Sequence, residues 1–319
     1  MMGTGSFAEP TFAALLESGQ GIVGLFTQPD RRTGKERGST RQAQVGVKEM
    51  AQARGVPVFQ PESINLPGGL DAVRALRPDL LVVAAYGQIL SNDVLAAAAR
   101  GGINVHASLL PKYRGAAPIN WAIYHGEKQS GVTIIRMSIH LDAGDMLAQE
   151  AVEIHPDETA GDLEARLAPL GAKLALDVIN RMARGEVWSG IKQDKTQATR
   201  APKLTKEHGL IDWRRSAEAI CNHVRAMQPW PTAYTYLHRH GQAPLRLIVS
   251  EARVAGGKPS EPGAVRSDES LKRLFVATGD EGHVEIAELQ PAGKRRMAAA
   301  DFLRGYPLTP EARLGPEAG

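Results

Sequence analysis

Asp79-Leu80-Leu81-Val82-Val83-Ala84-Ala85 is an apolar run of strand length that ends at Tyr86-Gly87. A strand that is apolar on both faces has to be covered on both sides, which is typical of a parallel sheet flanked by helices. Shorter apolar runs at 21–26, 57–59 and 103–106 have the same character. The region around the first run is therefore predicted to be α/β, with a doubly wound, mainly parallel sheet.

Helical patterns separate these runs, and further strands follow them. Ser91 or Asn92 can cap a helix that extends to Arg100, because short polar side chains accept hydrogen bonds from the first backbone N–H groups of a helix. Pro118 suits the first position of a helix that reaches Tyr124. The other predicted elements of this region are helices at 43–53 and 159–184 and strands at 132–137 and 148–154.

The pattern changes after residue 188. Residues 189–203 are polar and lack apolar periodicity, and a helix follows in which Ile220, Val224 and Met227 recur at helical spacing. Short strands separated by Gly and Pro, typical of a small β-barrel, are then predicted at 233–237, 245–249, 264–266, 271–277 and 284–289. We predict three segments, namely an α/β catalytic domain at 1–188, a linker at 189–205 and a barrel domain at 206–319.

The composition of the 319-residue chain excludes several classes of protein. Hydrophobic residues make up 43% and charged residues 23%, which is ordinary for a globular protein. The sequence has no apolar run of about 18 residues and no basic, apolar leader, so we expect no membrane span, no signal peptide and a cytoplasmic location. The single cysteine, Cys221, excludes an internal disulfide framework and a cysteine-based zinc site.

Charge is distributed unevenly along the chain, whose net charge is +3. Residues 1–189 contain 18 basic and 20 acidic side chains, whereas residues 190–319 contain 20 basic and 15 acidic ones. A basic C-terminal third points to a polyanionic partner. A solvated surface rich in lysine and arginine would give the same counts, so this alternative stays open.

A candidate catalytic group lies where the strand at 103–106 ends. Asn104 and His106 are two residues apart, so their side chains share one face of the strand. The C-terminal ends of strands in an open α/β sheet form the ligand-binding crevice. Asp142, in a loop between two later strands, offers a carboxylate that could pair with His106. Each residue alone is more often structural, and Asp142 in particular could be a turn residue.

Three separated blocks resemble one family of enzymes. They are Asn104-Val105-His106-Ala107-Ser108-Leu109-Leu110-Pro111, Arg114-Gly115-Ala116-Ala117-Pro118-Ile119 and Leu141-Asp142-Ala143-Gly144-Asp145-Met146-Leu147. In this order they are similar to the formyltransferases that use 10-formyltetrahydrofolate. Further blocks resemble the methionyl-tRNA branch of that family and extend the likeness over almost the whole chain, at 26–30, 85–87, 203–206, 211–213, 228–231 and 289–294.

The resemblance implies a Rossmann-like catalytic domain and an OB-like C-terminal barrel that binds tRNA. It implies that 10-formyltetrahydrofolate is the co-substrate and that the acceptor is the amino group of methionine on the initiator tRNA, as in translation initiation. The implied catalytic residues are Asn104, His106 and Asp142. The expected folate-binding residues are Tyr86, Gly87, Gln88, Ile89, Leu90, Ser108, Leu109, Leu110, Pro111, His140, Leu141, Gly144 and Asp145, although plain core packing is an equal alternative for Leu109 and Leu110.

Basic residues outside this pocket are the candidates for tRNA contacts through phosphate groups. They are Lys35, Arg37, Arg41, Lys203, Lys206, Lys294, Arg295 and Arg296. Any one of them could instead be a solvated surface charge. We expect a monomer. We also expect no metal, because none of the nine histidines has metal-ligand spacing.

The candidate residues suit formyl transfer to an amine, which passes through a tetrahedral intermediate that carries an oxyanion. Asn104 and a protonated His106 could each donate a hydrogen bond to this oxygen, and such donors are worth roughly 3–4 kcal/mol in comparable sites. Asp142 would orient His106 and favour its charged form. Asp142 could also take the proton of the amine, directly or through a water, and His106 could help to protonate the leaving folate nitrogen.

Two features depart from the family pattern. Family members usually begin with an apolar strand before the segment that corresponds to Met2-Gly3-Thr4, so we expect either an upstream start or a sheet that lacks a strand. The basic, glycine-rich loop after Asp30 is altered to Arg31-Arg32-Thr33-Gly34-Lys35-Glu36-Arg37-Gly38. Three other functions remain as alternatives, namely a sugar-nucleotide N-formyltransferase, a 10-formyltetrahydrofolate hydrolase and a tRNA-binding module that has lost catalysis.

Overall fold

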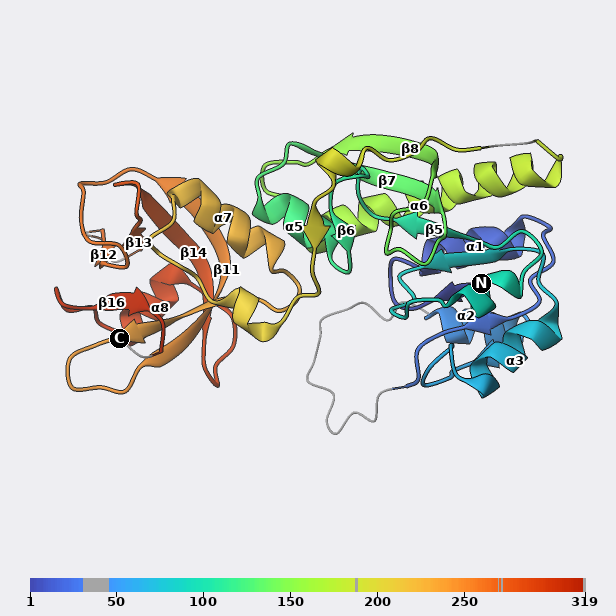
Figure 1. The fold of residues 1–319 in the computed structure, drawn as a ribbon. Helices are drawn as coiled ribbons and strands as arrows, with labels where there is room; N and C mark the ends of the chain where they lie inside the picture. Colours follow the sequence, from blue (N-terminus) through green and yellow to red (C-terminus); the bar gives the residue numbers. More distant parts are fainter. Residues whose placement is uncertain (31–45, 187–188, 269, 271, 318–319) are drawn as a thin grey trace. The chain divides into compact units, whose positions relative to one another are not determined.

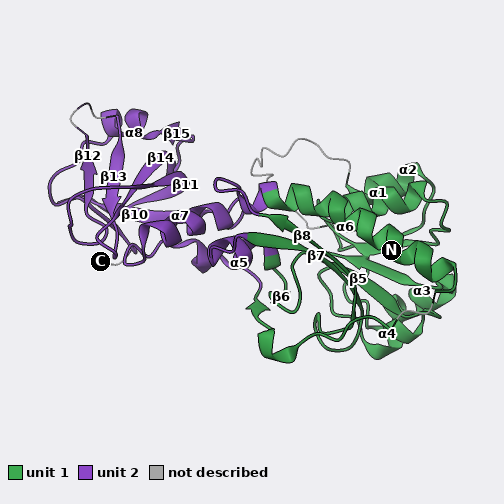
Figure 2. Ribbon diagram, turned by 90° about the horizontal axis from the view of Figure 1, so that it is seen from above, with its two compact units in different colours: residues 1–118, 129–153, 163–202 green, residues 119–128, 154–162, 203–319 purple. Residues whose placement is uncertain are grey.

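The computed structural model describes residues 1–30, 46–186, 189–268, 270 and 272–317 (Figure 1). The chain forms two compact units that are interleaved along the sequence (Figure 2). Unit 1 comprises residues 1–118, 129–153 and 163–202, and unit 2 comprises residues 119–128, 154–162 and 203–319. The domain limits 1–188, 189–205 and 206–319 stay predictions.

Within the described residues, unit 1 is built on one seven-stranded sheet with the order β3-β2-β1-β4-β5-β7-β8. Its strands are β1 (Met2–Gly3), β2 (Leu25–Phe26), β3 (Val58–Phe59), β4 (Leu81–Ala84), β5 (Gly102–His106), β7 (Gln129–Arg136) and β8 (Met146–Glu153). Strands β1 to β5 pair in parallel, whereas β7 and β8 are antiparallel. The predicted α/β, mainly parallel architecture is confirmed.

Helices cover both faces of this sheet, as the continuous apolar character of β4 requires. The helices are α1 (Glu9–Glu17), α2 (Val47–Ala53), α3 (Pro67–Leu76), α4 (Asn92–Ala96) and α6 (Ala160–Ala183), of which α6 belongs to unit 1 from residue 163 onward. On one face, Val73 of α3 and Val94 of α4 pack with Leu81 and Val83 of β4. On the other face, a Cβ on Gly171 of α6 would lie 2.7 Å from Val105, so only glycine permits this close approach.

The first strand corrects one expectation from the sequence. The sheet does not lack a strand, because Met2–Gly3 forms β1 between β2 and β4, with Met2 paired to both Phe26 and Val83. Two residues are too few to show a strand pattern in the sequence. A Cβ on Gly3 would lie 2.8 Å from the Cβ of Ala8, so glycine lets the chain pack tightly where the strand leads toward α1.

Several element boundaries also differ from the prediction. Ser91 caps α4 as expected, since its hydroxyl accepts a hydrogen bond from the N–H of Val94 at 3.3 Å. The helix ends at Ala96 rather than at Arg100, whose backbone N–H instead bonds to the carbonyl of Asp79 at 2.8 Å. The predicted strand at 21–26 is strand only at Leu25–Phe26. Helices α1 and α3, each with a proline in its first turn, were not predicted.

Among its described residues, unit 2 contains one mainly antiparallel sheet with the order β12-β13-β14-β11-β10-β16, and β15 pairs with β14. A bridge between Ala264 and Arg313 brings the two ends of the order together, so the predicted small barrel is confirmed. The elements are α7 (Ala217–Ala226), β10 (Ala233–His238), β11 (Leu245–Ala255), β12 (Val265–Ser267), β13 (Leu274–Ala277), β14 (His283–Pro291), β15 (Met297–Ala298), α8 (Ala299–Gly305) and β16 (Arg313–Gly315).

Helix α5 (Pro118–Tyr124) belongs to unit 2 from residue 119 onward, although it comes early in the sequence. The amide of Asn120 donates to the carbonyl of Ala226 at the end of α7, at 2.7 Å. The rings of Tyr124 and His223 meet edge to face, with centroids 5.3 Å apart. A short 3₁₀ turn, η2 (Lys206–Gly209), also lies in this unit, and the carbonyl of His208 accepts a hydrogen bond from the His223 ring at 2.8 Å.

The segment between α6 and unit 2 is part of unit 1 up to residue 202. It contains a 3₁₀ turn, η1 (Lys195–Gln197), and a short strand, β9 (Arg200–Ala201). Strand β9 pairs in parallel with β6 (Arg114–Gly115). None of the helices in the described part of the chain is both long and apolar enough to cross a membrane.

Candidate active site

The three predicted catalytic residues meet at the end of β5. Asn104 and His106 come from this strand, and Asp142 comes from the connection between β7 and β8. The Asn104 amide donates to Oδ1 of Asp142 at 3.2 Å, and Nδ1 of His106 lies 3.6 Å from Oδ2 of the same carboxylate. The backbone N–H of Gly115 donates to Oδ2 at 2.9 Å. One carboxylate thus collects three polar partners from two further elements.

The site is nearly closed to solvent around these atoms. The side chain of His106 is 5% exposed and that of Asp142 is 9% exposed. Nε2 of His106 lies 2.9 Å from the carbonyl oxygen of Tyr113, which can only accept, so this nitrogen carries a proton. The second proton of an imidazolium would then point toward Asp142. A direct hydrogen bond from Nε2 to an oxyanion would require this N–H to leave Tyr113.

Backbone strain accompanies the site. Asp142 has φ of 48° and Tyr113 has φ of 60°, in the left-handed region that residues with a Cβ rarely occupy. Conformations of this kind cost of order 1–3 kcal/mol and persist only where neighbouring contacts enforce them. A Cβ on Gly144 would lie 1.7 Å from the carbonyl oxygen of Arg136, so the loop that carries Asp142 is pressed against β7 at that point.

The turn after β5 is fixed by the polar side chains of Thr133 and Gln149, which are not among the predicted site residues. The hydroxyl of Thr133 donates to the carbonyl of Ser108 at 2.6 Å and accepts from the N–H of Leu110 at 3.2 Å. The amide of Gln149 donates to this hydroxyl at 2.8 Å and to the carbonyl of Leu110 at 3.0 Å. These contacts place the segment that follows His106.

Several residues expected to contact folate have side chains directed into the protein. The Ser108 hydroxyl is buried and donates to the carbonyl of Lys112, and Leu110 is buried. Tyr86 and Leu90 belong to the hydrophobic core of unit 1, and burial raises the pKa of Tyr86 to about 12. Contacts from these residues to a ligand therefore depend on their backbone groups. Leu109 and Pro111 are half-buried in the same turn.

The side chain of Gln88 ties the turn from Tyr86 to Leu90 to its surroundings. Gln88 accepts from the N–H of Ile64 at 2.7 Å through its side chain, so this amide supports a neighbouring loop. Gly87 has φ of 80°, which favours glycine. Ile89 is 65% exposed. The side chains of His140 and Leu141 are exposed as well, whereas residues Gly144 and Asp145 are half-buried in the loop around Asp142.

The segment after α6 reaches the site, although the sequence predicts a linker there. The Gln193 side-chain amide accepts from Nε and Nη2 of Arg114 at 3.0 and 2.7 Å, and it donates to the carbonyls of Asp142 and Gly144 at 2.8 Å each. Thr199 accepts from the N–H of Tyr113 at 2.8 Å. Apolar periodicity cannot reveal such residues, because they act through polar contacts to segments distant in the sequence.

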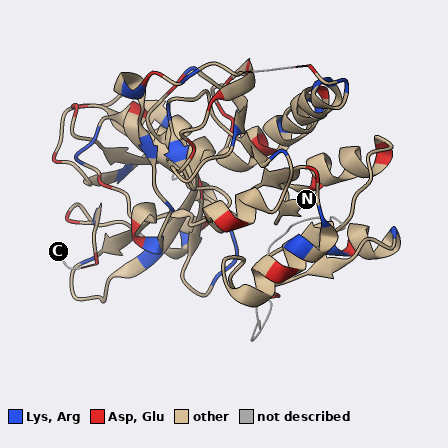
Figure 3. Cartoon of the chain, turned by 45° about the vertical axis from the view of Figure 1, so that its right-hand side comes forward, with Lys and Arg blue, Asp and Glu red and all other residues tan. Residues whose placement is uncertain are grey.

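The candidate tRNA-binding residues fall into two groups. Lys35, Arg37 and Arg41 lie outside the described residues. Lys203, Lys206, Lys294, Arg295 and Arg296 are exposed on unit 2, whose basic and acidic residues are interspersed (Figure 3). Arg296 pairs with Glu288, so part of its charge is already compensated.

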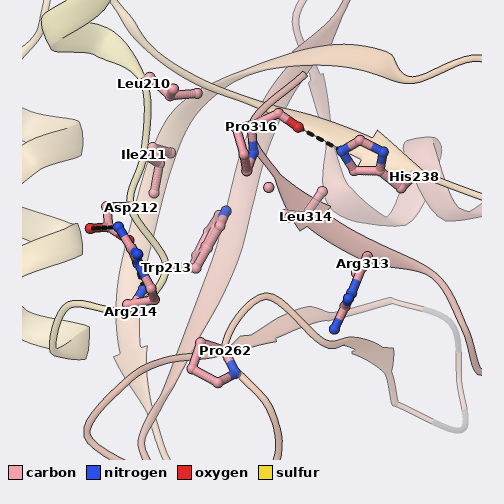
Figure 4. A pocket seen from close by; sticks show the side chains of 11 residues that line it. Leu210, Ile211, Asp212, Trp213, Arg214, His238, Pro262, Arg313, Leu314 and Pro316 are labelled. Atoms are coloured by element: carbon pink, nitrogen blue, oxygen red, sulfur yellow. Dashed lines mark hydrogen bonds and ion pairs between the residues drawn. The ribbon is translucent and has the colours of Figure 1, made fainter. Parts of the chain in front are cut away.

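A separate cavity of about 540 Å³ lies in unit 2 (Figure 4). Its lining is largely apolar and includes Trp213 and Leu314. Its charged groups are engaged, since Asp212 pairs with Arg214 at 2.8 Å and the ring of His238 bonds to the carbonyl of Pro316 at 2.7 Å. It contains no group of side chains comparable with the site at β5. Within the described parts of the chain, no cluster of three or more His, Cys, Asp and Glu residues could hold a metal ion.

Comparison with known proteins relates both halves of the chain to one family. The family described as formyl transferase matches residues 1–179, and the formyl transferase C-terminal domain matches residues 203–307. Methionyl-tRNA formyltransferase of Acidobacterium capsulatum is 46% identical over 98% of this chain and 98% of its own length. The corresponding enzyme of Citrifermentans bemidjiense is 44% identical over 98% and 95%.

A solved structure shows the same fold at lower identity. The N-formyltransferase from Helicobacter canadensis, solved with folinic acid and dTDP-3-aminofucose, has a TM-score of 0.65 at 15% identity, over 89% of this chain and 97% of its own.

Proposed function

Because the chain belongs to the formyl transferase family, we propose that it transfers the formyl group of 10-formyltetrahydrofolate to the amino group of methionine on the initiator tRNA. The observation that carries this proposal is the likeness to methionyl-tRNA formyltransferases, which continues through both units at more than 40% identity. A relationship of this extent includes the C-terminal barrel as well as the site at β5. Initiator methionyl-tRNA and the formyl folate are then the two substrates.

The geometry at β5 supports a mechanism for this transfer. The neutral amine attacks the formyl carbon, and the carbonyl oxygen becomes an oxyanion. Asp142 accepts a hydrogen bond from one of the two N–H groups of the Asn104 amide, so the other N–H group can donate to the oxyanion. The imidazolium form of His106 adds positive charge beside it. Preorganised donors of this kind cost no rearrangement at the moment of reaction.

Proton transfers complete the reaction. The Asp142 carboxylate accepts the proton that the attacking nitrogen loses. His106 gives its Nδ1 proton to the folate nitrogen as the bond from that nitrogen to the formyl carbon breaks, while Nε2 keeps its proton on the carbonyl of Tyr113. The proton on Asp142 then returns to Nδ1 across the 3.6 Å pair. The products are the formylated amine and tetrahydrofolate, and both protein groups regain their starting states.

The five candidate basic residues that are exposed on unit 2 support a role in tRNA binding through phosphate groups. Folate would contact the backbone of the turn at 86–90 and of the loop at 140–145, because the side chains of Tyr86 and Leu90 in the first turn face the core. The soluble substrates support a cytoplasmic location for the reaction, and a monomer would suffice because one chain carries all three catalytic side chains.

An assay of acceptor choice tests the function. The chain is incubated with formyl folate and, in separate reactions, with methionyl initiator tRNA, free methionine or a nucleotide-linked amino sugar, and the formylated product is measured. We expect transfer to the charged tRNA and, at most, trace transfer to the other acceptors. Preferred transfer to the amino sugar would identify a sugar-nucleotide formyltransferase, and release of formate without any acceptor would identify a hydrolase.

A further inference from the structure

We propose that Gln193 is a positioning residue for Asp142, so that the segment after α6 completes the catalytic site. This inference rests on the proposed formyl transfer and adds a residue to it. Gln193 does not touch the reacting atoms. It acts through the backbone of the loop that presents the carboxylate.

All hydrogen-bonding groups of the Gln193 amide are used. A primary amide has two N–H donors and one oxygen with two lone pairs. The oxygen accepts from Nε and Nη2 of Arg114, and the two N–H groups reach the carbonyls of Asp142 and Gly144. Arg114 can only donate and the carbonyls can only accept, so the amide has one workable orientation. The side chain is 9% exposed, which makes each lost contact costly.

The two carbonyls that Gln193 holds bracket the strained part of the loop. Asp142 has φ of 48°, and Gly144 sits where a Cβ would collide with Arg136. Without the two N–H donors, the backbone at Asp142 can relax toward an unstrained conformation. The carboxylate would then move away from Asn104 and His106. Displacement of a catalytic group by about 1 Å can lower a rate roughly a hundredfold.

Residues 193–201 form a clamp, which holds the Asp142 loop through Gln193 and holds β6 through β9. The side-chain oxygen of Gln193 accepts a hydrogen bond from the Arg114 guanidinium, and the neighbouring Gly115 donates its backbone N–H to the Asp142 carboxylate. The backbone N–H of Arg114 is held by the carbonyl of Thr199 at 2.9 Å, and Gly115 pairs with Ala201. A single segment, residues 193–201, therefore fixes both the loop with Asp142 and the strand that donates to it.

The test replaces Gln193 with an isosteric side chain that cannot donate. Gln193→Glu keeps the acceptor for Arg114 but turns an oxygen toward the carbonyls of Asp142 and Gly144. Gln228→Glu is the matched control, because Nε2 of Gln228 also donates to two backbone carbonyls, those of Val224 and Ser250 at 3.2 and 2.8 Å, but in unit 2. Thermal stability, kcat and both KM values are measured, together with amide hydrogen exchange in residues 138–147.

We expect both variants to melt at lower temperature than the wild type. Only Gln193→Glu should lower kcat, by about ten- to a hundredfold with KM for either substrate nearly unchanged, because the carboxylate acts in the transition state. Only Gln193→Glu should also speed exchange at 138–147.

An unchanged kcat in Gln193→Glu, an equal loss in both variants, or a raised KM at constant kcat would each overturn the inference. The exchange measurement does not depend on any substrate. If the wild type fails to formylate methionyl-tRNA, the proposed function is wrong, whereas unchanged exchange at 138–147 in Gln193→Glu rejects the clamp itself.

Discussion

Replacing Asp142 by asparagine removes the carboxylate while keeping its size. The carboxylate accepts from Gly115 at 2.9 Å and from Asn104 at 3.2 Å, on different oxygens, and faces His106 at 3.6 Å. An asparagine has one acceptor oxygen, so its NH2 group must face one of these donors. A hydrogen bond to a charged group contributes about 1.5–3 kcal/mol, so a stability loss of about 2 kcal/mol is expected.

The catalytic loss should be larger than this loss of stability. A positioned general base typically contributes about a hundred- to a ten-thousandfold, so kcat of Asp142→Asn should fall within that range. The rate is measured with saturating formyl folate and charged initiator tRNA, well below the melting temperature of the variant. KM should change little, because the proton is accepted only after both substrates are bound.

A control separates catalysis from folding. Asp280 likewise has three polar partners, the hydroxyl of Thr278 and the N–H groups of Ala217 and Gly282, but in unit 2. Asp280→Asn should lower the melting temperature and leave kcat unchanged. If Asp142→Asn retained a kcat within about threefold of the wild type, the carboxylate would not be the proton acceptor, and the mechanism would have to be abandoned.

Three further predictions concern the loop, the tRNA and acid stability. Gly144→Ala should lower kcat at least about tenfold, because its Cβ would collide with the carbonyl of Arg136 and shift the loop, and the specific rate of purified, folded protein measures this. Lys294→Ala combined with Arg295→Ala should reduce the slope of log tRNA affinity against log salt by about 2, and an unchanged slope in filter-binding titrations would exclude these residues from the interface. Burial lowers the pKa of His223 from its ordinary value of 6.5 to about 4 in the folded chain. Between these two values the imidazole of the unfolded chain binds a proton and that of the folded chain does not. The free energy of unfolding should therefore fall by up to about 3 kcal/mol as the pH drops from 6.5 to about 4. Urea denaturation at about pH 7 and about pH 5 should show that His223→Gln weakens this dependence.

The sequence predicted those parts of the site that follow from local geometry. Asn104 and His106 lie together because they are two residues apart at the end of a strand, and the architecture of the sheet places that end at the crevice. Asp142 was predicted as their partner from its loop and from the family resemblance. The structure brings it within 3.6 Å of His106. The roles of the three residues stay predictions until the variants are measured.

Other features could not be predicted because they depend on contacts between distant segments. The polar run at 189–203 resembles a linker by composition, yet Gln193 and Thr199 contact segments about 50 to 90 residues away in the sequence. The buried side chains of Tyr86 and Ser108 belong to turns for which the family resemblance implies ligand contacts. In both cases the direction of a side chain depends on tertiary packing, which periodicity does not encode.

The pairing of β6 with β9 affects how relatives of this chain could exchange segments by recombination. A crossover placed directly after α6, at the position suggested by composition, would join the Asp142 loop of one parent to the clamp of another. If Arg114 and Gln193 came from parents that differ at these positions, the turnover of the hybrid would fall even though it carried every catalytic residue. A crossover after residue 202 keeps the loop, β6 and β9 in one lineage, so hybrid enzymes joined there should keep their turnover more often than hybrids joined at residue 188.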